Sequence, residues 1–110
     1  MKLICTPLTE EAMSLLDNDR CPSALLECLR LTDSEHLKLE KPGIFDVINN
    51  ALGKMIDNYE DEHITIQKDL VRTLKVLRNS SLPVAPDLLK KLIHINEVAI
   101  VRKTGIFFYF

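Results

Sequence analysis

The sequence lacks several of the features by which binding and catalytic sites are usually recognised. It has no tryptophan and only three glycines, which are separated by at least nine intervening positions at 43, 53 and 105. A phosphate-binding loop needs several glycines close together, so this spacing excludes one. The apolar run at the N-terminus, MKLIC, is too short for a signal peptide. We therefore expect an intracellular protein in the cytoplasm, with the nucleus as the alternative.

Cysteine and histidine are also scarce and scattered. The three cysteines are odd in number and contain no Cys-x-x-Cys pair, which argues against a disulfide framework and a zinc ribbon. If Cys21 and Cys28 shared a helix, its rise would separate them by ~10 Å, beyond disulfide reach. We interpret both, together with Cys5, as small buried hydrophobic residues.

No catalytic or metal-binding pattern is present in the sequence. The three histidines lie in different segments and no two have metal-ligand spacing: His36, His63 and His94. None of them forms a local signature with a cysteine that would indicate a nucleophilic enzyme. We therefore expect no metal, no cofactor and no enzymatic activity.

The balance of charge limits the classes of partner. With 14 basic and 16 acidic residues, the net charge of −2 provides no general attraction to nucleic acid or to acidic membranes. A content of 46% hydrophobic and 27% charged residues is ordinary for a folded protein of one domain. Nucleic acid and membrane are thus the less favoured partners, and a protein partner is favoured.

The stretch from Thr65 to Ser81 has the clearest two-sided pattern in the chain. An apolar stripe at helical spacing predicts the buried side of a helix: Ile66, Leu70, Leu74 and Leu77. A polar and mostly basic stripe predicts an exposed side: Lys68, Arg72, Lys75 and Asn79. Pro83 and Pro86 follow, and they close this helix and open the next.

Other segments also have helical patterns, and nothing before residue 101 requires a sheet. We expect a helix that starts at Thr6-Pro7 or at Thr9 and ends near Asn18. A second helix is expected from Pro22, burying Leu25, Leu26, Cys28 and Leu29, followed by a connector over residues 32–41 with at most one helical turn. Apolar residues from Ile44 to Tyr59 predict a buried helix over 42–59, and Pro86 begins a further helix over 86–97. The sequence therefore predicts an all-α fold of four to five helices.

The last ten residues, VRKTGIFFYF, do not share this pattern. They contain four of the six aromatic residues and have the composition of a β-strand, but they have no evident partner strand. We expect a single helical domain over residues 1–100 and an atypical tail over 101–110 that is disordered or is translated intron. The second idea rests on codons, since Val-Arg can be encoded by a splice donor and thymine-rich intron encodes runs of phenylalanine. Transcript sequencing tests it.

Residues 42–100 resemble the armadillo repeat, a three-helix unit of about 42 residues that stacks into a solenoid. Gly43-Ile44-Phe45 is similar to the start of its middle helix, and the third helix is matched in order by Gln67, Val71, Leu74, Leu77, Asn79 and Ser80. Residues 88–101 would start the next unit, so that about two units lie within residues 1–100. The ending Leu77-Arg78-Asn79 is also similar to the ataxin-ten family of armadillo-like proteins.

The resemblance implies a scaffold or adaptor that binds a partner protein. In peptide-binding armadillo proteins an Asn near the end of the third helix bonds the backbone of an extended partner, and Asn79 matches it. Lys75 stands where those proteins often have Trp, so the basic residues of this helix would favour an acidic segment. The predicted partner-binding residues are therefore Lys68, Arg72, Lys75 and Asn79.

Three other interpretations of the same pattern stay open. The basic stripe could be a solvated helix face, which is common on globular proteins. The helices could form a compact bundle that acts as an adaptor or a homodimer. The protein could also be an accessory factor that contacts nucleic acid, which would require one basic patch made of Lys68, Arg72, Lys75, Lys90 and Lys91.

Overall fold

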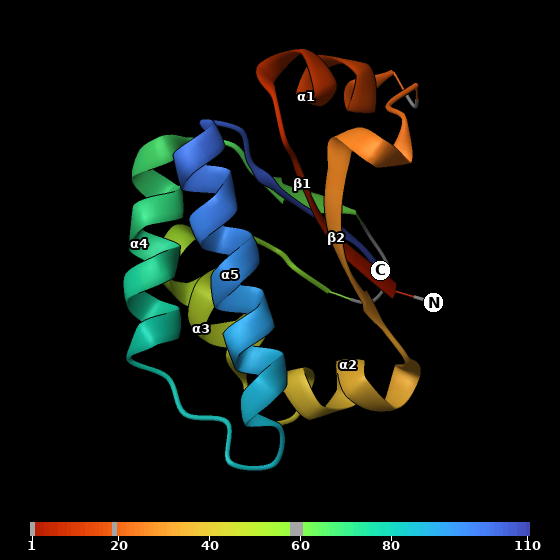
Figure 1. Ribbon diagram of the computed structural model, residues 1–110. Coiled ribbons are helices and arrows are strands. Elements are labelled where there is room, and N and C mark those ends of the chain that lie inside the picture. Colours follow the sequence, from red (N-terminus) through yellow and green to blue (C-terminus); the bar gives the residue numbers. More distant parts are fainter. Residues whose placement is uncertain (1, 19, 58–60) are drawn as a thin grey trace.

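The computed structural model, which describes residues 2–18, 20–57 and 61–110, contains a β-sheet with helices on one of its faces (Figure 1). Its elements are, in chain order, β1 (Lys2–Pro7), α1 (Glu10–Asp17), η1 (Ser23–Leu25), β2 (Leu26–Leu31), α2 (Asp33–Glu40), α3 (Ile44–Leu52), β3 (Glu62–Ile64), α4 (Gln67–Arg78), α5 (Pro86–Arg102) and β4 (Ile106–Tyr109). The sheet has four antiparallel strands in the order β2-β1-β4-β3. The predicted all-α fold, whether solenoid or bundle, is therefore wrong.

The aromatic segment near the C-terminus is an inner strand of this sheet. Strand β4 pairs with β1 on one side, where Phe108 lies opposite Ile4, and with β3 on the other, where Phe108 lies opposite Glu62. Only 1% of Phe108 is exposed. The expectation that this segment has no partner strand is wrong, because its partner β1 lies at the opposite end of the sequence. The intron hypothesis concerns the gene and stays a prediction for transcript sequencing.

Helices α3, α4 and α5 cover one face of the sheet, as Figure 1 shows, and the main core lies between these two layers. Alternating strand residues point into it: Ile4, Leu29, Leu31, Ile64, Ile106 and Phe108. The predicted apolar stripe of α4 contributes Leu70 and Leu77, both fully buried. Ile66 is 61% exposed because it precedes the first turn of the helix, so its assignment to the core is wrong.

Three of the predicted helices are confirmed. Helix α1 begins at the second of the two expected starts, with the Thr9 side chain accepting a hydrogen bond from the Ala12 amide at 2.9 Å. Helix α4 falls within the predicted stretch, and α5 begins at Pro86 but continues beyond residue 97 to Arg102. The predicted helix over 42–59 is shorter than expected, because Gly53 adopts a left-handed conformation with φ of 67° and ends α3. Tyr59 lies outside the described residues.

Two neighbouring segments differ from the prediction. The segment after Pro22 forms η1 and strand β2 instead of a helix. Leu29 and Leu31 point into the core while Cys28 and Arg30 lie on the other face, which is the two-residue period of a strand. The expected connector over 32–41 is helix α2, because Thr32 and Glu35 form a capping box at its start.

A set of close contacts fixes the passage from α5 into β4. The Thr104 hydroxyl donates a 2.7 Å hydrogen bond to the Pro7 carbonyl oxygen, which ties the end of α5 to β1. At Gly105, a Cβ atom would lie only 2.7 Å from the Ile64 carbonyl oxygen. A glycine is therefore needed where β4 enters the sheet beside β3.

Strands β1 and β2 are also joined covalently. Cys5 and Cys28 lie opposite each other in the antiparallel register, with their Cα atoms 4.1 Å apart, and form a disulfide, whereas Cys21 is free. The interpretation of Cys5 and Cys28 as unbonded residues is wrong. It failed because it assumed a helix at Cys28, and only the strand pairing brings that residue to Cys5.

Candidate functional site

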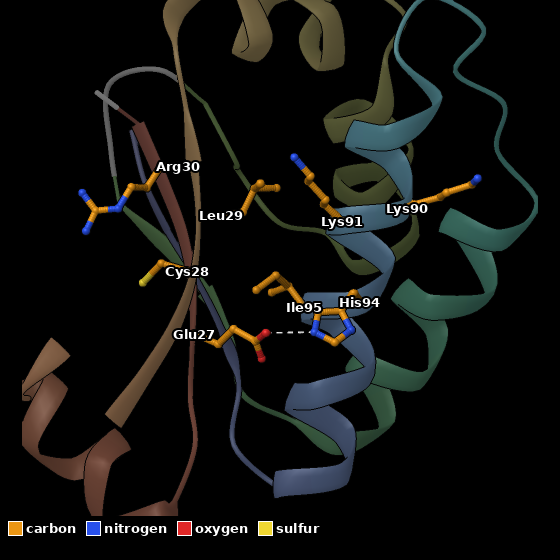
Figure 2. Close-up of a pocket in the computed structure, with 8 residues that line it drawn as sticks. All are labelled: Glu27, Cys28, Leu29, Arg30, Lys90, Lys91, His94 and Ile95. Atoms are coloured by element: carbon orange, nitrogen blue, oxygen red, sulfur yellow. Dashed lines mark hydrogen bonds and ion pairs between the residues drawn. The ribbon is translucent and has the colours of Figure 1, made fainter. Parts of the chain in front are cut away.

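A groove runs between strand β2 and helix α5, and we call it the β2–α5 groove (Figure 2). It has a volume of about 490 Å³ and is lined by Glu27, Cys28, Leu29, Arg30, Lys90, Lys91, His94 and Ile95. Leu29 and Ile95 point toward each other across its floor and are almost fully buried. The groove therefore has an apolar base beneath polar and charged walls.

The wall contributed by β2 is an open sheet edge. The strand order places β2 at the edge, with β1 as its neighbour. The short Cα distance between Cys5 and Cys28 is typical of a pair without mutual main-chain hydrogen bonds. The main-chain N–H and C=O groups of Cys28 and Arg30 therefore point away from β1, toward the open side. These groups can form a ladder with an added strand.

The charged residues of the β2–α5 groove are mainly cationic. Lys91 reaches into the space between β2 and α5, whereas Arg30 points away from α5 on the far side of β2 (Figure 2). Within the described ranges, no carboxylate lies within 4 Å of Arg30, Lys90 or Lys91. Glu27 is bound by His94, with 2.9 Å between its carboxylate and the ring Nε2. The groove thus favours negative charge.

The predicted partner-binding residues lie elsewhere, on an exposed side of α4 that we call the α4 cationic face. Lys68, Arg72, Lys75 and Asn79 are all exposed there. The Arg72 guanidinium donates a 3.2 Å hydrogen bond to the Ala51 carbonyl oxygen, and Asn79 is the C-terminal cap. The structure brings these residues onto one helix but tests no partner, so their role stays a prediction.

The basic patch considered for nucleic acid is divided between two helices, α4 and α5. Lys90 lies near the end of α4, in a hollow that Arg78 also lines. Arg78 is paired with Glu97 at 3.2 Å, so its charge is partly compensated. This arrangement adds no support to a continuous nucleic-acid surface across α4 and α5.

A second feature lies between α2 and α3, and we call it the carboxylate hollow. It has a volume of about 120 Å³ and is lined by His36, Glu40, Phe45, Asp46, Ile56 and Asp57. Three of these six residues carry carboxylates. The His36 ring is stacked on Phe45 at 5.4 Å and meets the edge of Phe110 at 4.6 Å. The hollow therefore combines negative charge with an aromatic wall.

The surroundings of His36 disfavour its charged form. Burial lowers the pKa of His36 and nearby Lys2 lowers it further, against the opposing effects of Glu40 and Asp33. Its Nδ1 lies 3.4 Å from a Glu40 carboxylate oxygen, which can only accept, so Nδ1 carries the proton. Nε2 is consequently an acceptor, and it is buried without a partner among the residues that the structure describes.

Charge is segregated between two consecutive segments of the chain. Residues 33–64, which include α2, α3 and β3, carry eight acidic residues against Lys38, Lys41 and Lys54. Residues 67–103, which include α4 and α5, carry eight basic residues against Asp69, Asp87 and Glu97. The net charge of −2 therefore hides an acidic segment and a basic one.

Neither a metal-binding cluster nor a membrane-spanning helix is found within residues 2–18, 20–57 and 61–110. No group of three or more His, Cys, Asp or Glu residues is arranged to hold a metal ion. None of the helices in that part of the chain is both long and apolar enough to span a bilayer.

The sequence matches no protein-family model and no curated protein. The fold has a solved counterpart. The structure is similar to the Neisseria DNA mimic protein DMP12, with a TM-score of 0.71 and 18% sequence identity, and the alignment covers 100% of each chain. At this identity the similarity establishes a common fold for the entire chain.

This fold overturns the armadillo interpretation. An armadillo unit consists of helices alone, whereas residues 62–64 and 106–109 form strands of a sheet that organises the whole chain. The resemblance to armadillo and ataxin-ten proteins rested on aliphatic residues at helical spacing. Amphipathic helices that cover a sheet have the same spacing, because they too bury one side.

Sequence reasoning missed most of the β2–α5 groove. The sequence predicts a helix from Pro22 where Glu27 and Arg30 lie, and it indicates Lys90 and Lys91 only as part of a basic patch for nucleic acid. The alternation of Leu29, Arg30 and Leu31 is the signal that could have revealed a strand. The sequence contains no signal that an open edge of this strand lies beside α5.

Proposed function

We propose that this protein is a non-enzymatic protein-binding domain whose partner is a DNA-binding protein. The observation that carries the proposal is the segregation of charge, which gathers Glu40, Asp46 and Asp57 around one hollow. Surfaces that bind DNA present Lys and Arg to phosphates, and most of their affinity is electrostatic. A surface of carboxylates can bind the same Lys and Arg residues of the DNA-binding protein. The proposed location is the cytoplasm or the nucleus.

The fold similarity supports this choice of partner. The counterpart from Neisseria is named a DNA mimic protein, and its chain is covered completely by the alignment. The small net charge of −2 would attract a basic protein only weakly, so the interaction depends on the local acidic surface. We therefore place the contact at the carboxylate hollow and its surroundings, away from the basic helices α4 and α5.

Competitive elution from immobilised DNA tests the proposal. Cell extract is loaded on DNA-cellulose, washed, and eluted with this protein, and the released proteins are identified by mass spectrometry. A DNA mimic should release a specific DNA-binding protein, which should then bind the purified protein in competition with duplex DNA. Release of nothing beyond the buffer control contradicts the proposal.

A matched pair of variants locates the contact. Asp46→Lys combined with Asp61→Lys reverses two exposed charges of the acidic segment and should weaken release by about tenfold or more. Glu10→Lys combined with Glu11→Lys makes the same change in net charge at exposed positions of α1. Equal release by both variants would show that the carboxylate hollow is not the contact surface.

A further inference from the structure

The open edge of β2 is a second interaction surface, independent of the carboxylate hollow. Its outward main-chain groups at Cys28 and Arg30 are spaced two residues apart, as a strand ladder requires. Beside them lies the β2–α5 groove, with an apolar floor at Leu29 and Ile95. An extended polypeptide laid along β2 would gain main-chain hydrogen bonds and cover this floor.

The charges around the edge indicate what kind of segment fits. Side chains of an added strand would point alternately toward α5 and toward the opposite face of the sheet. Those on the α5 side would lie beside Lys91 and His94, and those on the opposite side would lie beside Arg30. We propose that β2 accepts an extended acidic segment of a partner protein as a fifth strand, with acidic residues on both of its faces.

Two other occupants fit the edge less well. A second copy of the chain that paired through β2 around Cys28 would bring the cationic Lys91 side chains of both copies to the same junction, and their like charges repel. Nucleic acid could contact the cations, but it has no peptide groups with which to complete a β ladder. The open edge therefore selects a polypeptide, and the cations select an acidic one.

Selection from a display library of random ten-residue peptides tests the proposal on the intact protein. We expect the selected peptides to be enriched in Asp and Glu and to contain alternating β-forming residues. Bound peptide should slow hydrogen exchange at the amides of Cys28 and Arg30, which face solvent in the free protein. Methylation of alternate peptide nitrogens that face β2 should abolish binding. Selection of non-acidic peptides, or protection at another surface, overturns the proposal.

Charge-reversal variants provide the matched control. Arg30→Glu with Lys91→Glu should weaken binding of the selected peptide by about tenfold or more, whereas Arg72→Glu with Lys75→Glu should change it less than about twofold. Equal effects overturn the proposal. A dimeric protein whose amides at Cys28 and Arg30 are protected without peptide also overturns the proposal. Displacement of the peptide by random duplex DNA overturns it as well. The Arg30 and Lys91 variant should still release a DNA-binding protein from DNA-cellulose, which separates this proposal from the proposed function.

Discussion

Cys5 on β1 and Cys28 on β2 lie directly opposite each other and are joined by a disulfide, with their Cα atoms 4.1 Å apart. The bond closes a loop that contains α1 and η1, and it attaches the edge strand that forms one wall of the β2–α5 groove. Cys28 both lines the groove and carries the disulfide. In a reducing compartment the same two residues would be neighbouring thiols.

Reduction of this disulfide should destabilise the protein. With 23 residues of sequence separation, closing the loop restricts the unfolded chain and contributes about 3 kcal/mol in the chain-entropy model. Urea unfolding with and without dithiothreitol measures the difference. Cys21→Ser is the control and should leave the midpoint unchanged, because Cys21 is free. Equal midpoints with and without reductant would show that the disulfide does not contribute.

Truncation of a side chain in the aromatic segment should be as costly as a core mutation. Phe108 is 1% exposed and lies on the core-facing side of β4, so Phe108→Ala should lower the free energy of unfolding by about 3–5 kcal/mol. Val101→Ala, at a position 75% exposed, should change it by less than about 0.5 kcal/mol. Chemical denaturation measures both. A small effect at Phe108 would contradict the central position of β4.

Acid should destabilise the protein through His36. Burial, aided by Lys2, lowers the pKa of His36 in the folded state below the unfolded value of about 6.5. The unfolded state then binds more protons, so this contribution is present above about pH 6.5 and is lost as the pH falls below it. Urea unfolding at pH 7.5 and pH 5 should show a larger loss for the native protein than for His36→Phe. Equal losses of stability in the native protein and in His36→Phe would contradict the role of His36.

The α4 cationic face and the β2–α5 groove are competing sites for an acidic ligand. The sequence alone predicts that Arg72→Glu with Lys75→Glu weakens capture of an acidic partner. From the structure we expect this variant to keep its affinity within about twofold, because α4 offers cations without an open strand edge. Both residues are exposed, so the thermal midpoint should stay within a few degrees. A loss specific to this variant would restore the α4 cationic face as the site.

The helices were predictable because their evidence is local. Thr9 and Pro86 mark the starts of α1 and α5, and Leu70 and Leu77 recur at the spacing that the i to i+4 hydrogen bonds of a helix impose. The strands were not predictable from local patterns, because residues 106–109 pair with β1 and β3, which lie far away in the sequence. The two candidate surfaces were not predictable for the same reason, because each is formed by residues from separate elements.

The sequence by itself determined the amphipathic helices α1, α4 and α5, the exposure of Lys68, Arg72 and Lys75, and the absence of a recognisable catalytic motif. Only the tertiary structure decided that a sheet lies at the centre, that Cys5 meets Cys28, and that Arg30 and Lys91 flank one open edge. A helix forms its main-chain hydrogen bonds within one segment, whereas a strand forms them with another. Pairing between distant segments therefore set both the fold and the surfaces proposed for binding.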